Sequence, residues 1–280
     1  DAGIDGRELQ AAWMGNAAAV VVIGQERISG QVALRELGIG KIPVVNVENA
    51  CASSSTALQQ ACALVSAGCY DIVLACGFEK LFHEDKARSL GAFSSAVDVE
   101  DPRGELKALE AMAEAAGETL EAGDVGGNRS VFMDIYSLMA KKHMKEFGTT
   151  KEDFALVSSK NSFHGSLNPR AQFREEISVQ QVLDARTIIE PLTLPMCSPI
   201  GDGAAAVVLV SESKARELGL RNPVRIRSSV LVSGWDFENE GESVGAFAAG
   251  QAYEEAGVGP EDLSCVELHD ASAPSEILAY

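Results

Sequence analysis

The chain has 280 residues, which exceeds one ordinary domain of about 100–150 residues and suggests two domains or one large duplicated fold. Hydrophobic residues make up 46% of the chain and charged residues 23%, so it can bury a sizeable core and is not expected to be disordered. The formal net charge of −18 repels phosphate backbones and anionic lipid headgroups, which argues against a role at a nucleic acid or a membrane surface. The longest apolar run, residues 17–23, is too short to span a bilayer, and the first residues do not predict a secretion signal.

The cysteines and histidines do not predict a metal site. The chain has six cysteines and four histidines, and no two cysteines form a Cys-x-x-Cys pair. This spacing fits neither a zinc site nor a disulfide framework, so we expect no metal and a reducing, cytoplasmic location. Four of the cysteines are expected to be small buried hydrophobic residues: Cys62, Cys69, Cys76 and Cys265.

The first eighty residues alternate between apolar runs and helical patterns. We expect strands at residues 17–23, 42–47 and 71–76, with helices at 29–37 and 53–67 between them. Each helix pattern stops at a glycine, which is the usual residue after a helix C-terminus. Strands that are unbroken apolar runs, alternating with helices, indicate a sheet covered on both faces.

The middle of the chain is helical, and the strand pattern returns after it. From about residue 81 to 196 we expect an insertion that contains helices at 104–120, 130–146 and 151–161. Residues 204–211 then predict another buried strand and residues 214–218 a short helix. After Pro223, residues 224–232 predict a strand that opens a second half of the fold.

An internal repeat supports a duplicated fold. Residues 1–9 align without gaps on residues 255–263, and the segments that follow are both expected to enter a strand. If the second half copies the first, the counterpart of Cys51 would lie beyond Tyr280. We therefore expect this chain to be a piece of a longer one, poorly soluble and inactive on its own.

Cys51 is the cysteine most suited to chemistry. It lies between the strand expected at 42–47 and the helix expected at 53–67. Backbone N–H groups point outward at such a helix N-terminus, and together with the helix dipole they stabilise a thiolate. The neighbouring residues Ala50, Ala52 and Ser53 are small and would let an acyl group approach. The position suits a nucleophile, although by position alone a structural thiol is the slightly favoured interpretation.

Three segments resemble the thiolase superfamily. Residues 46–58 around Cys51 are similar to its nucleophile segment, and residues 197–209 to the segment entering the last strand of its N-terminal half. Residues 267–273, with His269-Asp270, are similar to its oxyanion-hole motif in the branch of the sterol carrier protein thiolases, or lipid-transfer proteins. The resemblance covers essentially the whole chain in order.

The resemblance implies an α/β fold, a thiolase-like αβαβα duplicated arrangement with a helical loop domain. Residues 1–222 would form the N-terminal thiolase half, with the loop domain inserted at about 81–196. Residues 223–280 would be the start of a truncated C-terminal half. The resemblance also implies an oligomer, so we expect a homodimer or a tetramer.

The resemblance also assigns site residues. It implies that Cys51 accepts an acyl group and that His269 supplies a donor to an oxyanion hole, alone or through water. Met133 and Ser198 would line the tunnel for the pantetheine of coenzyme A. Each of these three residues also has a plainer interpretation. His269 would be a structural histidine at a strand end, Met133 a core residue and Ser198 a turn residue. Asp270 would either orient the His269 imidazole or cap the helix that follows.

Several features depart from catalytic thiolases. The Gly-His-Pro segment and the Cys-x-Gly turn, which move protons in the family, are not found in these residues. Phe132 stands where classical members have histidine, and Ser272 stands where they have phenylalanine.

The function that the resemblance implies is an acyl-CoA C-acyltransferase that cleaves or condenses 3-oxoacyl-CoA, with a coenzyme A thioester as substrate and no cofactor. The alternatives are a retro-aldolase on sterol side-chain CoA thioesters with an acyl-CoA-binding partner protein, or a non-catalytic acyl-CoA or lipid binder.

Overall fold

The computed structural model describes residues 2–120, 123, 125–127, 129–234 and 243–280. The chain divides into two compact units, which are described separately. The sheet unit consists of Asp1–Glu84 and Gly201–Cys265, and the helical unit of Asp85–Ile200 and Val266–Tyr280.

The sheet unit is built on a four-stranded sheet in the order β2-β1-β3-β6. The strands are β1 (Ala11–Gly15), β2 (Val44–Val47), β3 (Ile72–Lys80) and β6 (Asp202–Val210). β1 pairs in parallel with both β2 and β3, whereas β6 pairs antiparallel with β3. This mixed sheet with helices on it confirms the α/β class.

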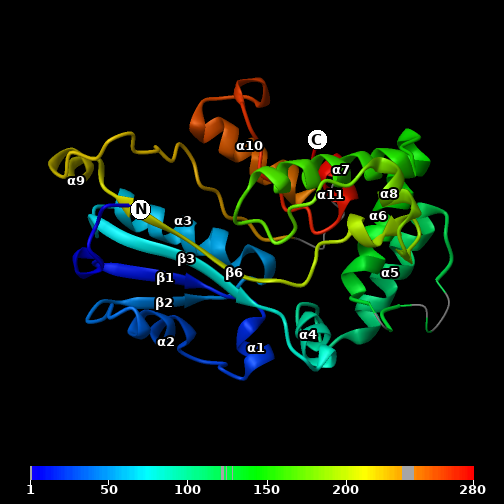
Figure 1. The fold of residues 1–280 in the computed structure, drawn as a ribbon, viewed down its shortest axis with the longest axis horizontal. Coiled ribbons are helices and arrows are strands. Elements are labelled where there is room, and N and C mark those ends of the chain that lie inside the picture. Colours follow the sequence, from blue (N-terminus) through cyan, green and yellow to red (C-terminus); the bar gives the residue numbers. More distant parts are fainter. Residues whose placement is uncertain (1, 121–122, 124, 128, 235–242) are drawn as a thin grey trace. The chain divides into compact units, whose positions relative to one another are not determined.

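Helices α3 (Ser53–Ser66) and α2 (Ser29–Glu36) cover opposite faces of this sheet (Figure 1). Side chains alternate between the two faces of a strand, and β1 follows this rule. Ala11 and Trp13 pack in the cluster that includes α3, while Ala12 and Met14 pack with Leu34 of α2. All five residues of β1 are therefore buried, which explains the continuous apolar sequence.

The prediction of a strand at residues 17–23 is wrong. The strand of this region is β1, which ends at Gly15, and the apolar run forms the short helix α1 (Ala19–Ile23). The carboxylate of Glu79 accepts hydrogen bonds from the backbone N–H groups of Ala17, Ala18 and Ala19 at 3.2, 3.0 and 2.5 Å. A carboxylate at this position satisfies the N–H groups of a helix start. This tertiary contact, from a residue sixty positions away, outweighs the β propensity of the valines.

The other elements of the sheet unit follow the sequence prediction with two corrections. Strand β6 forms as expected, but it is an edge strand and its first six residues are exposed rather than buried. Residues 224–232 do not form a strand in the described part of the chain, and Val224 is 92% exposed. A strand needs a partner for its backbone hydrogen bonds, and none pairs with this segment among the described residues. The remaining helices are α9 (Glu212–Glu217) and α10 (Val244–Ala256).

The two copies of the internal repeat share the same local structure. The 3₁₀ helix η1 (Gly6–Glu8) in the first copy corresponds to η4 (Pro260–Asp262) in the second. Gly3 and Gly257, which align in the repeat, both have a left-handed backbone, with φ angles of 70° and 63°. This left-handed conformation favours glycine. The similarity of backbone as well as sequence favours duplication.

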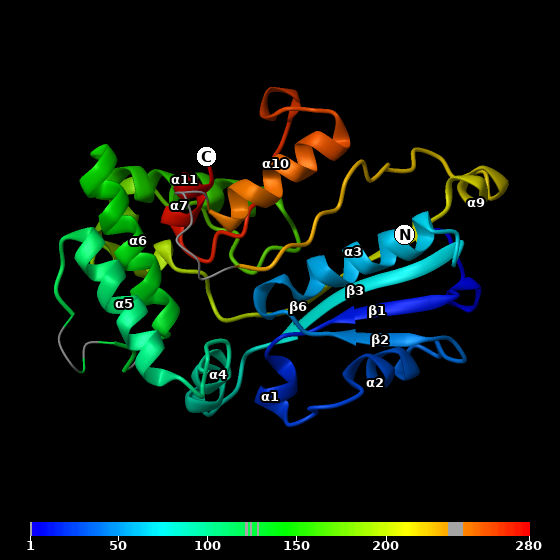
Figure 2. The same ribbon diagram turned by 180° about the vertical axis from the view of Figure 1, so that it is seen from behind.

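The helical unit contains α4 (Lys86–Phe93) and the three predicted helices, which are α5 (Pro102–Ala116), α6 (Val131–Phe147) and α7 (Lys151–Leu167) (Figure 2). The chain continues through α8 (Val179–Asp184), the hairpin β4 (Thr187–Ile189) and β5 (Leu192–Thr193), and η3 (Leu194–Met196). The last helix, α11 (Ala273–Ala279), packs on α7 and α6. A buried cluster of residues from α6, α7, α8, β5, η3 and α11 forms its larger core: Ala140, Phe154, Ala155, Val157, Val182, Leu192, Met196 and Ala273.

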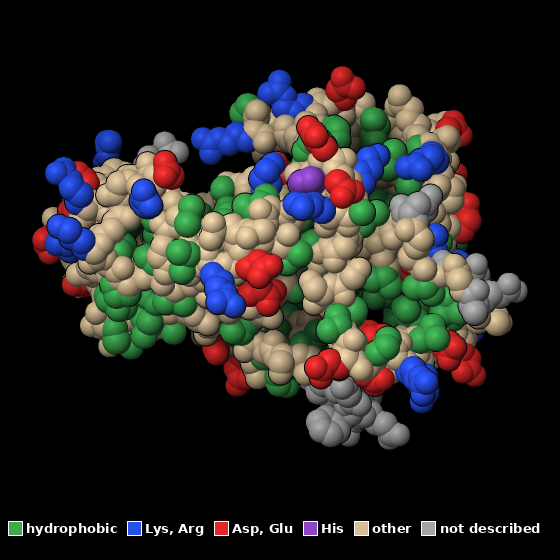
Figure 3. Space-filling model, turned by 90° about the horizontal axis from the view of Figure 1, so that it is seen from below, with side chains coloured by type: hydrophobic (Ala, Val, Ile, Leu, Met, Phe, Trp, Pro, Cys, Tyr) green, Lys and Arg blue, Asp and Glu red, His purple; other side chains and the backbone are tan. Residues whose placement is uncertain are grey.

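The surface carries side chains of both charges and also exposed hydrophobic side chains. On the face that Figure 3 shows, basic side chains lie in small groups beside acidic ones. None of the helices in the described part of the chain has the length and hydropathy that a membrane span requires.

Candidate active site

Cys51 lies in a sharp turn between a strand and a helix of the sheet unit. The 3₁₀ helix η2 (Ala50–Ala52) follows β2 and leads directly into α3. Ala50 has a φ angle of 44°, a left-handed conformation that is unusual for a residue with a Cβ atom. The Cys51 side chain is exposed at the start of the helix, as its place in the sequence predicts.

Hydrogen bonds hold this turn in its strained conformation. The Ala50 N–H donates to Glu48 Oε1 at 2.7 Å. The Ser53 hydroxyl donates to the Ala50 carbonyl at 2.7 Å and accepts from the Asn49 N–H at 2.9 Å. The Asn49 amide donates to Thr56 Oγ1 at 2.9 Å. These bonds satisfy polar groups on both sides of Cys51, so the thiol is presented on a fixed backbone.

Two glycines allow the first turn of α3 to touch the sheet. Gly15 of β1 and Gly77 of β3 are paired in the register, and Gly15 is also paired with Val47, the last residue of β2. A Cβ atom at Gly15 would lie 2.8 Å from the backbone of Ser53, and one at Gly77 would lie 1.9 Å from Ser54 Oγ. Both glycines lack this atom, so the helix N-terminus rests on the backbone at the carboxyl ends of the parallel strands. The sequence prediction did not include this pair, although glycines at the ends of apolar runs are a signal of close approach.

The other cysteines have different surroundings from Cys51. Burial raises the pKa of the Cys62 and Cys76 thiols above the usual range and that of Cys197 to about 11. These three groups are therefore thiols, not thiolates, at neutral pH. The expectation that Cys69 and Cys265 are buried is wrong, since both are exposed. Cys69 follows the glycine that ends α3, and Cys265 lies in a segment that pairs with no described strand.

The helical unit brings Ser198 and the segment of His269 together. The Ser198 N–H donates to the Ala271 carbonyl at 3.0 Å, and Cys197 forms an antiparallel bridge with Ser272. Ser198 and His269 thus lie on two adjacent backbone segments, both with exposed side chains. Cys51 belongs to the sheet unit, whereas these residues and Met133 belong to the helical unit.

Asp270 has a partner that the sequence did not predict. Its carboxylate accepts a hydrogen bond of 3.1 Å from the Asn161 amide of α7. The expected alternative, capping of the following helix, is not seen, because the N-cap of α11 is Ser272 and makes no side-chain capping bond. Asn161 was missed because a polar residue on a helix is usually solvated, and its contact joins segments 109 positions apart.

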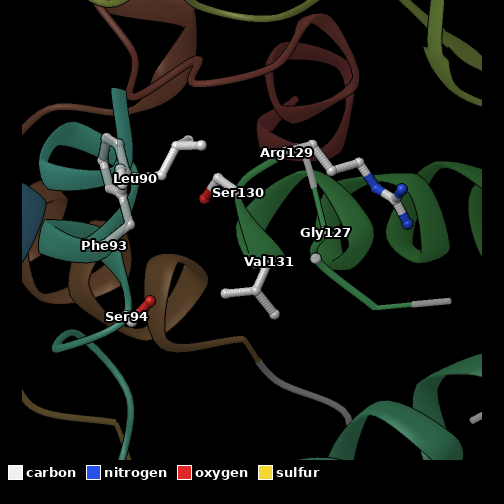
Figure 4. A pocket seen from close by; sticks show the side chains of 10 residues that line it. Leu90, Phe93, Ser94, Gly127, Arg129, Ser130 and Val131 are labelled. Carbon is white, nitrogen blue, oxygen red and sulfur yellow. The ribbon is translucent and has the colours of Figure 1, made fainter. Parts of the chain in front are cut away.

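Met133 is half-buried in the first turn of α6. Its neighbours Ser130 and Val131 line a hollow of about 340 Å³, and Met133 itself is not among the lining residues. Figure 4 shows Leu90 and Phe93 of α4 on one side of this hollow and Ser130 and Val131 on the other. Phe132 packs edge-to-face on Phe93, with ring centroids 6.4 Å apart. The lining combines apolar side chains with the hydroxyls of Ser94 and Ser130.

Among the described residues that line this hollow, the one cation is already neutralised. Arg129 forms an ion pair with the buried carboxylate of Asp134, which also accepts the Gly126 N–H at 2.9 Å. Among the described residues no group of three or more His, Cys, Asp and Glu side chains could hold a metal ion.

Comparison with known proteins identifies the family. Residues 1–213 match the family described as thiolase, N-terminal domain. The chain belongs to the thiolase family, whose members use coenzyme A thioesters as substrates and need no cofactor. Its relatives include thiolases and sterol carrier protein 2, so it matches the sterol carrier protein branch expected from the sequence.

Three curated relatives illustrate this range. The chain is 37% identical over 284 residues to the acetyl-CoA acetyltransferase of Methanothermobacter thermautotrophicus, covering 100% of the chain and 67% of that relative. It is 34% identical to the benzoylsuccinyl-CoA thiolase subunit BbsB of Thauera aromatica, covering 97% and 64%. It is 33% identical to sterol carrier protein 2 of Bos taurus, covering 90% and 45%. The chain therefore spans about two thirds or less of these relatives.

A solved structure shows the same fold. The Ltp2-ChsH2(DUF35) aldolase superposes with a TM-score of 0.65 over 98% of this chain and 65% of that one, at 23% sequence identity. Together with the family match over residues 1–213, this similarity confirms the expected thiolase-like fold.

Proposed function

We propose that the protein is a thiolase-type acyl-CoA C-acyltransferase in which Cys51 is the nucleophile. The observation that carries this proposal is the strained turn that presents Cys51 at the N-terminus of α3. The positive end of the helix dipole stabilises a thiolate at this place. Family membership and the acetyl-CoA acetyltransferase relatives support the same reaction class.

The proposed cleavage proceeds in two steps. The Cys51 sulfur bonds to the carbonyl carbon distal to the thioester of a 3-oxoacyl-CoA. The adjoining carbon–carbon bond breaks, and its electron pair forms the enolate of a shorter acyl-CoA, which then takes a proton. The thiol of a second coenzyme A attacks the acyl-cysteine, loses its proton and releases the longer acyl-CoA together with the Cys51 thiolate. Condensation is the reverse of these steps.

The residues of the helical unit have supporting roles in this proposal. The His269 imidazole donates a hydrogen bond to the enolate oxygen, directly or through water. Ser198 and Met133 contact the pantetheine and the reacting thioester. We also propose that residues 1–222 form a thiolase half with its loop domain at about 81–196, that residues 223–280 begin the second half, and that the protein works as a cytoplasmic homodimer or tetramer.

Replacement of Cys51 tests the proposal. We expect Cys51→Ala in the complete protein to lose thiolysis of acetoacetyl-CoA and to lose the acyl adduct that mass spectrometry detects on the Cys51 peptide. Cys69→Ala is the matched control, because it removes another exposed thiol just beyond the same helix. Thiolysis by Cys51→Ala at the rate of the unaltered protein would overturn the proposal.

The fold similarity to the Ltp2-ChsH2(DUF35) aldolase favours a second candidate function. This would be retro-aldol cleavage of a sterol side-chain CoA thioester, together with a partner protein that binds acyl-CoA. Such a reaction does not need the cysteine nucleophile, so Cys51→Ala would retain aldol cleavage. Saturable binding of an acyl-CoA with neither reaction would indicate the lipid-binding alternative.

A further inference from the structure

Lys160 and Asn161, two neighbouring residues of α7, contact carboxylates that follow His269 in the chain. Lys160 Nζ lies 2.7 Å from Glu276 Oε1 on the first turn of α11. Asn161 Nδ2 donates hydrogen bonds of 3.1 Å to both Glu276 Oε2 and Asp270 Oδ2. The Asn161 amide group therefore links Asp270, the residue after His269, to Glu276 of α11.

Glu276 is a fixed anchor for this arrangement. Its side chain is only 7% exposed, and a buried carboxylate is costly unless its oxygens are paired. Burial would raise its pKa, but the donors Lys160, Tyr280 and Asn161 outweigh burial and lower the pKa below the usual range. The Tyr280 hydroxyl bond is 2.7 Å long. The carboxylate is therefore charged at neutral pH and is held in one position by three donors.

An asparagine suits its place between two carboxylates. The two N–H groups of its Nδ2 atom can each donate to one oxygen, and the side chain carries no charge. An aspartate of the same shape has no donor there at neutral pH and would add a third negative charge next to Asp270 and Glu276. The contacts thus depend on hydrogen-bond donation by Asn161 and not only on its size.

We propose that Asn161 is a positioning residue for the reaction of this protein. It holds Asp270 against α7 and so fixes the adjacent His269 imidazole where the enolate oxygen forms. This inference rests on the proposed function, in which His269 is the oxyanion donor. A displacement of about 1 Å at such a donor can lower a reaction rate by about 10²-fold.

The test compares two reactions of the same protein. In the complete protein we expect Asn161→Ala and Asn161→Asp to lower kcat for cleavage of a 3-oxoacyl-CoA, beginning with acetoacetyl-CoA, by about 10- to 100-fold, with little change in KM. Acylation of Cys51 by acetyl-CoA forms no enolate, so Asn161→Ala should carry it out at the rate of the unaltered protein. Ser159→Ala is the control, since it removes a 2.7 Å hydrogen bond that the same helix makes to the Ile177 carbonyl and not to Asp270 or Glu276. Its kcat should not change.

A double-mutant cycle probes the same bond from the other side. Asp270→Ala should reproduce the loss in kcat, and combining it with Asn161→Ala should add little, because both remove one interaction. Unchanged cleavage in Asn161→Ala, fully additive losses, or an equal loss of Cys51 acylation would overturn the inference. Failure of acetyl-CoA to acylate Cys51 in the unaltered protein would instead overturn the proposed function, and this inference with it.

Discussion

Gly77 of β3 faces Ser54 of α3 so closely that a Cβ atom at residue 77 would lie 1.9 Å from Ser54 Oγ and 2.6 Å from its Cβ. This contact seats the helix that begins just after Cys51 directly on the sheet. The position of the proposed nucleophile, which follows β2, therefore depends on the absence of a side chain on β3, on the other side of β1. The same holds for Gly15, where the atoms approached are backbone atoms of Ser53 and Ser54.

We expect Gly77→Ala to lower the free energy of unfolding by about 1–3 kcal/mol, because the added methyl group forces the start of α3 away from β3. Ser54→Gly in the same chain should recover most of this loss, since it removes the atoms that clash. Urea denaturation of the complete protein measures both effects. Gly91→Ala is the control, because a Cβ atom there meets nothing within 4 Å, and it should not destabilise. A Gly77→Ala protein as stable as the control would contradict this account.

We expect iodoacetamide at pH 7.5 to modify Cys51 much faster than Cys197. Burial raises the pKa of Cys197 to about 11, so its reactive thiolate is scarce at this pH, whereas Cys51 is exposed beside a helix N-terminus. Peptide mass spectrometry after timed labelling measures both rates, and labelling in urea shows that each peptide can be detected. Equal rates in the folded protein would show that burial does not protect Cys197.

We expect Glu276→Gln to weaken the acid dependence of stability. The pKa of Glu276 is lowered in the folded protein, so its charge stabilises the fold above the unfolded pKa of about 4.3, and this stabilisation is lost as pH falls through the folded pKa. Urea unfolding at several pH values from 3 to 6 should show a steeper decline for the unaltered protein than for Glu276→Gln. Parallel curves would contradict the predicted direction of the pKa shift.

Asp134 provides a comparison between buried and exposed ion pairs. We expect Asp134→Ala to lower the unfolding free energy by about 3 kcal/mol, because it leaves the Arg129 charge and the Gly126 N–H without this buried carboxylate, which is 3% exposed. Glu146→Ala removes a half-exposed pair with Lys142 and should cost at most about 1 kcal/mol. The two variants are compared by the same urea denaturation, and equal costs would show that burial of Asp134 has no energetic consequence.

The sequence by itself determined the α/β class, most helices, and the place of Cys51. These features depend on local spacing, on glycine stops and on residues that are neighbours in the chain, such as those around Cys51. The resemblance of three segments was enough to predict the family. Helical spacing and glycine stops involve residues that are close in the chain, so they can be recognised without knowledge of the fold.

Only the tertiary structure decided the features that depend on distant contacts. The valines of residues 19–23 form a helix because Glu79 caps it, and residues 224–232 form no strand because no described strand pairs with them. Gly15, Gly77 and Asn161 show no special role until the fold brings Ser54 and Asp270 to them. Hydrogen bonds and close contacts between residues far apart in sequence leave no periodic pattern, and for this reason the structure was needed to find them.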